Sequence, residues 1–82
     1  MRSLANFGSA VRRHRESIGL SQEDFAERAG MDRTYVSGIE RGSRNPTLRI
    51  LYKLADALGV QPEDLFRTAR QIAEEEKPSQ DR

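Results

Sequence analysis

Hydrogen-bonding side chains recur at helical spacing between residues 33 and 41. Arg33 and Thr34 precede Ser37 by four and three residues, and Arg41 follows it by four, so a helix would bring them to one side. Arginine offers a planar fork of N–H donors, and each hydroxyl can both donate and accept. Such a face is suited to recognising phosphates and base edges through hydrogen bonds, without making or breaking covalent bonds.

The composition gives little support for catalysis or for metal binding. The chain has no cysteine and a single histidine, His14, so no thiolate or histidine-based metal site is expected. It has no glycine-rich phosphate loop and no nucleophile–base pair, and we expect neither an enzyme nor a cofactor. His14 falls on an apolar helix face, where a partly buried histidine bonded to backbone or water is favoured over a catalytic or pH-sensing one.

The length and charge suggest a small domain in water. No run approaches the ~20 apolar residues that span a membrane, and the N-terminus lacks the apolar core of a secretory signal, so a soluble, cytoplasmic protein is expected. No small-molecule effector is expected. Residues 1–53 carry a charge of +4 and residues 54–82 carry −3. This asymmetry would orient the basic part toward a polyanion, although ordinary scatter of surface charge is an alternative.

The segment 22–42 has the pattern of two short helices joined by a tight turn. Ser21 and Asp24 form a start similar to a capping box. Gly30 stands where the first helix should end, since glycine tolerates the positive φ of a tight C-terminal turn. Asp32 is expected to cap the second helix with its side chain.

Apolar and small residues of this segment are placed so that the two helices can cross. Ala26 supplies a small side chain at the closest approach, and Val36 and Ile39 lie three residues apart on the inner side of the second helix. The polar residues then face outward, which predicts a helix-turn-helix whose second helix is free to enter a DNA major groove. An ordinary pair of core helices is the alternative, and the joint match of these positions favours DNA binding.

These residues resemble a known family. The run QEDFAERAGMDRTYVSGIERG resembles the lambda-repressor-like, Xre-type helix-turn-helix domain. The shorter run DRTYVSGIERGSRNPTL is similar to the recognition segment of the controller proteins of restriction–modification systems, and to many small repressors. The resemblance covers roughly Phe7 to Phe66. It implies an all-α, five-helix domain within residues 1–76, with the helix-turn-helix at 22–42.

The resemblance also implies a function. Domains of this family bind double-stranded DNA as homodimers on near-palindromic operators, so we expect a transcriptional regulator, autoregulatory in the manner of controller proteins. A phage-type or chromosomal repressor, or an antitoxin, carries the same domain and stays open. A protein-interaction adaptor is the alternative from a different class, but it would favour aromatic and aliphatic residues on the exposed face of residues 33–41.

Site residues follow from the resemblance together with the exposed polar positions. Arg33 can contact guanine O6 and N7 bidentately. Gly38 leaves the reading face without a side chain that relatives carry, so part of the specificity is expected from DNA shape. The predicted DNA-binding residues are Ser21, Gln22, Arg33, Thr34, Tyr35, Ser37, Arg41, Ser43, Arg44 and Asn45.

Two further charged residues are implied to be structural. In the family, an arginine at the position of Arg15 pairs with the glutamate near the end of the recognition helix, which is Glu40 here. A guanidinium can hold a carboxylate bidentately and so fix the first helix against the third. Neither residue is expected to contact DNA.

The remaining helices are expected to flank this unit. A frayed lead-in at 1–6 precedes a helix whose apolar stripe is Phe7, Val11, His14 and Ile18. Another helix begins at a Thr47 cap, with Leu48, Leu51, Leu54, Ala55 and Leu58 facing the core. The last helix, 62–76, has an apolar face wider than a small core needs, which suggests a dimer interface at Leu65, Phe66 and Ala69. Residues 77–82 are expected to be disordered.

Overall fold

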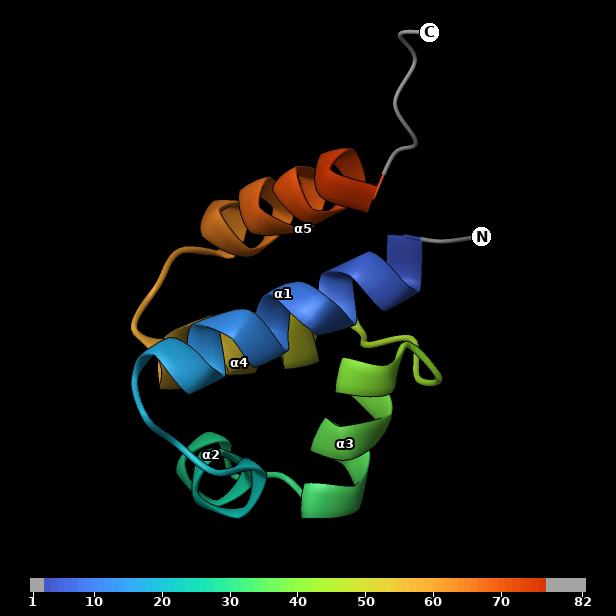
Figure 1. Cartoon of the computed structure of the whole chain (residues 1–82). Helices are drawn as coiled ribbons and strands as arrows, with labels where there is room; N and C mark the ends of the chain where they lie inside the picture. Colours follow the sequence, from blue (N-terminus) through green and yellow to red (C-terminus); the bar gives the residue numbers. More distant parts are fainter. Residues whose placement is uncertain (1–2, 77–82) are drawn as a thin grey trace, which may run out of the picture.

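The computed structural model describes residues 3–76, which form five α-helices and no strand. The helices are α1 (Ser3–Ser17), α2 (Gln22–Ala29), α3 (Arg33–Arg41), α4 (Leu48–Leu58) and α5 (Pro62–Glu76). Helix α1 crosses the middle of the molecule, with α5 on one side, α2 and α3 on the other, and α4 behind it (Figure 1). The most extensive contacts of α1 are with α5 and α3. The all-α, five-helix prediction is confirmed.

Local signals set the ends of the two short helices. The Ser21 hydroxyl accepts a hydrogen bond from the Asp24 amide at 3.0 Å, which satisfies one of the free N–H groups at the start of α2. Gly30 ends α2 with φ of 70°, a left-handed conformation that costs glycine little. Asp32 occupies the N-cap position of α3, but its side chain makes no capping hydrogen bond. The prediction that the Asp32 side chain caps α3 was therefore wrong.

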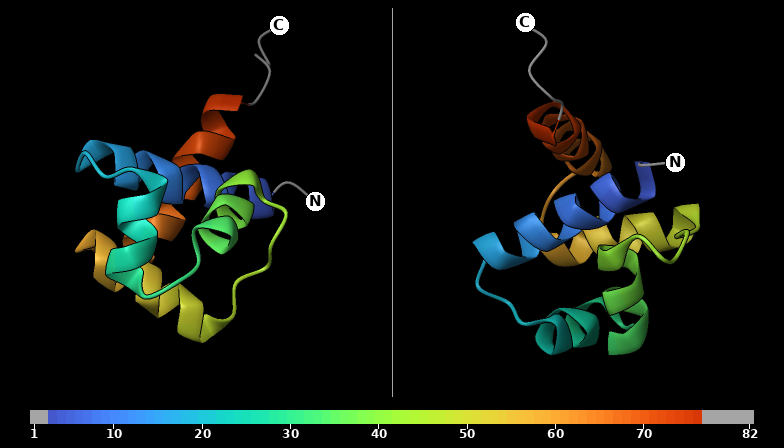
Figure 2. Two further views of the ribbon diagram at one scale, coloured as in Figure 1. Left: turned by 90° about the horizontal axis from the view of Figure 1, so that it is seen from below. Right: turned by 45° about the vertical axis from the view of Figure 1, so that its right-hand side comes forward.

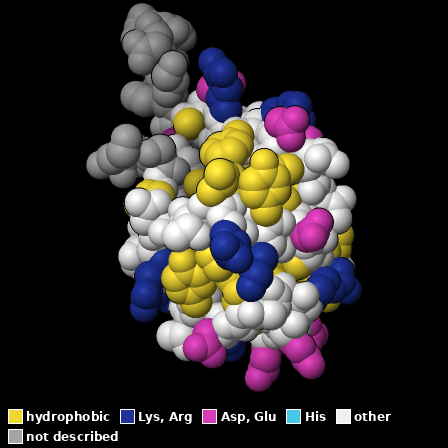
Figure 3. Space-filling view, turned by 180° about the vertical axis from the view of Figure 1, so that it is seen from behind, with side chains coloured by type: hydrophobic (Ala, Val, Ile, Leu, Met, Phe, Trp, Pro, Cys, Tyr) yellow, Lys and Arg dark blue, Asp and Glu magenta, His cyan; other side chains and the backbone are white. Residues whose placement is uncertain are grey.

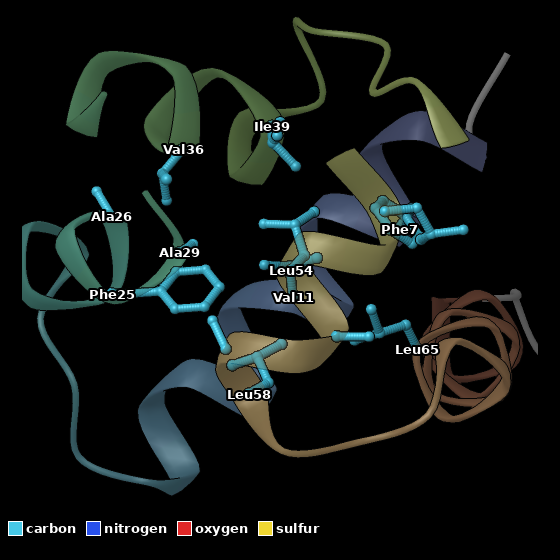
Figure 4. Packing of buried hydrophobic residues seen from close by; sticks show 13 residues of the cluster. Phe7, Val11, Phe25, Ala26, Ala29, Val36, Ile39, Leu54, Leu58 and Leu65 are labelled. Atoms are coloured by element: carbon cyan, nitrogen blue, oxygen red, sulfur yellow. The ribbon is translucent and has the colours of Figure 1, made fainter. Parts of the chain in front are cut away.

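One hydrophobic core lies where the helices meet. Each of the five helices provides at least one of the largest fully buried side chains, so all five helices pack around the same interior (Figure 4). These side chains are Phe25, Ile39, Leu54, Leu65, Val11 and Val36. Helix α2 packs on α3 and α4, and the right-hand view of Figure 2 shows α2 and α3 together on one side of α1. This packing holds α3 at the edge of the molecule with one side left in solvent.

Close contact between α1 and α3 depends on Gly8, a residue without a predicted role. A Cβ atom at Gly8 would lie 2.1 Å from the Ile39 carbonyl oxygen and 2.6 Å from that of Glu40. Those distances are far below van der Waals contact, so any side chain at Gly8 would separate the two helices. The end of α3 therefore rests directly on the backbone of α1.

Several boundary residues differ from the sequence-based expectations. Helix α1 already includes residues 3–6, and Asn6 is buried, so these residues are not a frayed lead-in; residues 1–2 lie outside the described part. Ile18 lies beyond the last turn of α1 and is 44% exposed, and Leu48, in the first turn of α4, is 68% exposed. Residues at helix ends have packing partners on fewer sides, which a periodic pattern does not convey. The expectation for residues 77–82 lies outside the described residues.

No helix within residues 3–76 is long and apolar enough to cross a membrane.

Candidate nucleic-acid interface

Arg33, Thr34, Ser37 and Arg41 are spaced to share one side of α3, and Tyr35 lies at the edge of that side. Arg33, Thr34 and Arg41 are exposed, and Ser37 is half-buried. The Arg41 guanidinium donates a hydrogen bond to the Ser37 hydroxyl, so these two side chains lie together along the helix. Tyr35 is half-buried and packs partly against the core. We call these five residues the outward face of α3.

The arginines on and beside this face lack carboxylate partners. Arg12, Arg13, Arg67 and Arg70 each lie within 4.0 Å of a carboxylate oxygen. Among the described residues, the guanidinium groups of Arg33, Arg41 and Arg44 have no such partner, and neither have those of Arg28 and Arg49 elsewhere in the chain. Three unpaired arginines on and beside one exposed helix produce a local positive potential. Such a surface attracts anions and leaves its N–H donors available to them.

A buried polar cluster fixes α3 from behind. Arg15 donates from Nε to one oxygen of Glu40 at 2.7 Å and from Nη2 to the other at 3.0 Å. Its third nitrogen, Nη1, donates to the Leu20 carbonyl at 2.7 Å, and Gln22 donates to Glu40 at 2.9 Å. The Arg15 and Glu40 side chains are 9% and 3% exposed. This cluster ties the end of α1, the start of α2 and the end of α3 into one rigid unit.

The ion pair also favours the charged form of Arg15. Its pKa is raised above the ordinary arginine value, mainly by the hydrogen bond to Glu40, with burial acting in the opposite direction. An arginine is charged at neutral pH in any case, and the pair with Glu40 further favours that charged form. The geometry leaves both members of the pair turned inward, away from the outward face of α3.

The start of α2 carries two more predicted residues. The Ser21 side chain is exposed and serves as the α2 cap. The Gln22 amide is half-buried and is held by Glu40. Gln22 therefore belongs to the buried cluster as well as to the helix N-terminus, a role that its sequence position alone did not indicate. The fixed amide and the cap place α2 rigidly beside α3.

The loop after α3 folds back onto that helix. Ser43 donates to the Gly38 carbonyl both from its amide, at 2.9 Å, and from its hydroxyl, at 3.2 Å. The Arg44 guanidinium lies over the Tyr35 ring, 5.6 Å from the ring centroid. Gly38 is buried beneath Arg44. The sequence led us to expect a gap in the outward face at Gly38. The loop covers that side of Gly38, so no such gap is present.

Asn45 lies beside a second surface of the molecule. It is exposed but lines a shallow groove with Leu4, Pro46, Leu48 and Phe66. The groove has a volume of about 320 Å³ and is bounded by α1, α4 and α5. Asn45 therefore borders this groove while following Ser43 and Arg44 in the loop after α3.

Helices α4 and α5 expose large apolar side chains. Phe66 is 55% exposed and packs against Phe7 with ring centroids 5.6 Å apart, and Leu48 and Tyr52 are more than half exposed. Figure 3 shows hydrophobic side chains gathered on this side of the molecule. Leu48 and Phe66 line this groove, and exposed apolar side chains of this kind are found at protein interfaces. We call Leu48, Tyr52 and Phe66 the α4–α5 patch.

The predicted dimer residues divide between core and surface. Leu65 is fully buried inside the monomer and cannot contact a partner, so that part of the prediction was wrong. On the wide apolar face of α5, Leu65 lies toward α1 and α4, Phe66 is exposed to solvent, and Ala69 is half-buried. Leu48 and Tyr52 were not predicted for this surface. Their exposure depends on the packing of α4, which no local signal reports.

His14 has a structural partner. Its Nε2 lies 2.8 Å from the Thr68 hydroxyl, so it joins α1 to α5 through a side-chain hydrogen bond. The expectation of a half-buried, hydrogen-bonded histidine agrees with this position, but the partner is a side chain rather than backbone or water. Among the described residues, no group of three or more histidines, cysteines and carboxylates could hold a metal ion.

Comparisons with known proteins identify relatives of this arrangement. A family model described as helix-turn-helix matches residues 11–65. The control protein C.BamHI of Bacillus amyloliquefaciens is 50% identical to this chain over 73% of its length and 75% of the relative. The crystal structure of the restriction-modification controller protein C.AhdI from Aeromonas hydrophila has a TM-score of 0.79 at 47% identity, covering 80% of this chain and all of that one.

A third relative was solved with nucleic acid. The controller protein C.Esp1396I, crystallised as a tetramer in complex with its natural 35 base-pair operator, has a TM-score of 0.79 and 34% identity over 87% of this chain and 93% of that one. Both the matched range and the identities confirm the resemblance predicted from the motif at 22–42. The chain belongs to the helix-turn-helix family, together with the controller proteins of restriction–modification systems.

Proposed function

We propose that this protein is a sequence-specific DNA-binding transcriptional regulator of the controller type. The observation that carries the proposal is the set of unpaired arginines at the outward face of α3, which a rigid buried cluster holds at the edge of the molecule. An exposed helix of this kind can enter a major groove, where arginine donors meet guanine acceptors. Relatives that include an operator-bound controller protein support the same function.

The residues divide into two roles in this proposal. Arg33 and Thr34, at the start of α3, read base edges, with Ser37 and Tyr35 beside them. Residues at the ends of the unit hold the DNA backbone, which provides affinity without sequence information. These backbone-contacting residues are Ser21, Gln22, Arg41, Ser43, Arg44 and Asn45.

We further propose a homodimer on a near-palindromic operator. Two copies of α3 then enter successive major grooves about 34 Å apart, one helical turn. The α4–α5 patch lies on different helices from the outward face of α3, so two chains can join there while both faces stay free. Residues 1–76 act as one domain. Dimerisation would then set the protein concentration at which autoregulation begins.

Other biological roles share this molecular activity. A chromosomal or phage-type repressor, or an antitoxin, would bind DNA through the same face. A protein-interaction adaptor is the different-class alternative, but the outward face of α3 carries arginines and hydroxyls rather than an apolar groove. The α4–α5 patch is the surface that an adaptor would use instead.

Arg33→Ala is expected to weaken binding to the preferred duplex by about 5- to 150-fold, the range for losing one bidentate base contact. Fluorescence anisotropy with DNA from upstream of the protein's own gene, a scrambled duplex and a salt series would measure this loss. Binding to the scrambled duplex should change much less, because a base contact carries the preference. Arg41→Ala should weaken both duplexes and reduce the salt dependence by about one ion.

Arg12→Ala is the matched control for charge, since Arg12 is an exposed arginine on α1 paired with Glu16. Unchanged preference in Arg33→Ala would contradict the assignment of Arg33. Equal, weak binding of the unmodified protein to both duplexes, and to DNA selected from a random pool, would contradict specific DNA recognition and favour the adaptor.

Phe66→Asp is expected to raise the dimer dissociation constant by about 30-fold or more, as for a central apolar contact in an interface. A carboxylate at this position cannot be buried between two apolar patches without a partner. Analytical ultracentrifugation over a concentration series would measure the dimer dissociation constant, and circular dichroism would show that the helices are retained. Arg70→Ala, at a side chain that is 82% exposed on the same helix, should leave the dimer intact. A dimer of unchanged affinity in Phe66→Asp would place the interface elsewhere.

A further inference from the structure

Gly38 is buried in the middle of the helix that carries the DNA-facing residues. A Cβ atom there would lie 2.5 Å from Cγ of Arg44, 3.4 Å from its Nε and 3.5 Å from the Ser43 hydroxyl. These neighbours all belong to the loop after α3. The missing side chain therefore creates the space in which the loop lies against the helix.

We infer that Gly38 is a positioning residue for sequence reading: it seats Arg44 along α3 so that the guanidinium covers Tyr35. The inference rests on the proposed DNA-binding function and adds a residue that makes no DNA contact of its own. Gly38 acts through Arg44, which holds the DNA backbone in the proposed function and also orders Tyr35 beside the base-reading residues.

Three contacts support this position of Arg44 against α3. The Ser43 amide and hydroxyl both donate to the Gly38 carbonyl, at 2.9 Å and 3.2 Å, so the loop is anchored at the same residue that lacks a side chain. The next residue, Arg44, then crosses Gly38 and places its guanidinium 5.6 Å from the Tyr35 ring centroid. Arg44 has no carboxylate partner among the described residues, so no ion pair competes with this arrangement.

The stack alone is too weak to hold Arg44 in place. An exposed cation–π contact is a modest interaction, and Arg44 is an exposed, rotamer-rich side chain. Close approach to α3 at Gly38 supplies the remaining restraint, because the Arg44 stem packs directly on the helix backbone. Without that approach, both Arg44 and Tyr35 would sample several rotamers before meeting DNA.

Gly38 is also unfavourable for the helix in which it lies. Glycine in a helix interior is less stable than alanine, and the seat for Arg44 is the compensating feature that the structure shows. The steric consequence of a substitution is specific. Because the atom nearest to a new Cβ is Cγ of Arg44, a side-chain atom rather than backbone, relief requires the Arg44 side chain to rotate about its first torsion angle while α3 stays in place.

Preassembly affects specific recognition more than general affinity. Ordering a long side chain on binding weakens association, so a side chain that is already ordered binds more tightly. The benefit applies where Arg44 and Tyr35 meet a defined site. Loose electrostatic contacts to an unrelated duplex gain little from it.

The test begins with the free protein. In the unmodified protein, the NMR resonances of the Arg44 side chain should be shifted by the Tyr35 ring. Gly38→Ala should move these resonances toward random-coil values while the melting temperature stays equal or rises. A lowered melting temperature, or an unchanged Arg44 environment, would overturn the inference without any reference to DNA.

The second measurement is a double-mutant cycle on DNA. Anisotropy would be measured with the duplex that the unmodified protein selects from a random pool, and with a scrambled duplex. Gly38→Ala and Arg44→Ala should each weaken binding to the selected duplex by about three- to tenfold. Because Gly38 acts through Arg44, the double variant should bind no more weakly than Arg44→Ala alone.

The possible outcomes separate this inference from the proposed function. If the unmodified protein prefers the selected duplex and Gly38→Ala keeps the full preference, the inference fails and the function stands. Losses that multiply in the double variant would likewise show that Gly38 acts independently of Arg44 and overturn it. If the unmodified protein shows no preference, the proposed function fails and this inference fails with it.

Discussion

Glu40→Ala is expected to lower the free energy of unfolding by about 3–5 kcal/mol, the range for removing one member of a buried ion pair. The substitution leaves Arg15 buried, with two of its hydrogen bonds to protein lost, the Leu20 carbonyl retained, and the exposed Glu16 carboxylate 4.0 Å away as its remaining acidic neighbour. Gln22 loses its partner as well. At about 4 °C or more per kcal/mol for a domain of this size, the melting temperature should fall by well over 10 °C in calorimetry or circular dichroism.

Arg12→Ala is the matched control for this result. Arg12 pairs with Glu16 on the surface of α1, where the two side chains are 63% and 55% exposed. An exposed pair contributes about 0–1 kcal/mol, so this variant should melt close to the unmodified protein. Equal losses in Glu40→Ala and Arg12→Ala would contradict the structural role of the buried cluster.

A second test separates loss of the pair from loss of packing. Replacing Arg15 and Glu40 together by methionine should recover much of the stability, because no charge is then left buried and unpaired. The same double variant removes the hydrogen bond that orients Gln22. Weaker DNA binding in a stable double variant would show that the cluster also positions the start of α2.

Gly8→Ala is expected to destabilise the fold by about 3 kcal/mol, at the upper end of the range for overpacking. Elsewhere in a helix the same change would stabilise by about 0.5–1 kcal/mol. Here the new Cβ would lie 2.1 Å and 2.6 Å from the carbonyl oxygens of Ile39 and Glu40. Because these atoms belong to the α3 backbone, relief requires the two helices to separate, which also disturbs the pairing of Glu40 with Arg15.

Gly38→Ala provides the internal comparison, since it is the same substitution in another helix. Its new Cβ would meet a flexible side chain instead of backbone. Denaturant unfolding should therefore show a large loss for Gly8→Ala and no loss for Gly38→Ala. Similar free energies of unfolding for the two variants would contradict the close backbone contact between α1 and α3.

These contacts show how a small domain presents a rigid helix to solvent. The inner side of α3 is held by Val36 and Ile39 in the core, by Glu40 in the polar cluster and by the backbone contact at Gly8. None of these residues lies on the outward face. Fixing a recognition helix from behind leaves its outward donors free, so DNA contacts need not contribute to folding.

Much of the fold could be predicted because its signals are local. The Ser21 and Thr47 caps and the turn at Gly30 follow from hydrogen bonding and backbone sterics within a few residues. The 3.6-residue period placed Val36 and Ile39 inward, and the motif placed the polar residues of α3 outward. The resemblance to the family then implied the pairing of Arg15 with Glu40, which lie 25 residues apart.

The remaining features depend on how the helices pack. Leu65 and Phe66 are adjacent and both apolar, and only the docking of α5 on α1 buries one and exposes the other. His14 and Thr68 meet across 54 residues for the same reason. Gly38 was assigned to the wrong environment because the loop that covers it folds back from outside the helix. Periodicity describes which residues share a side of one helix, whereas the neighbour on that side is set by the long-range contacts of the folded chain.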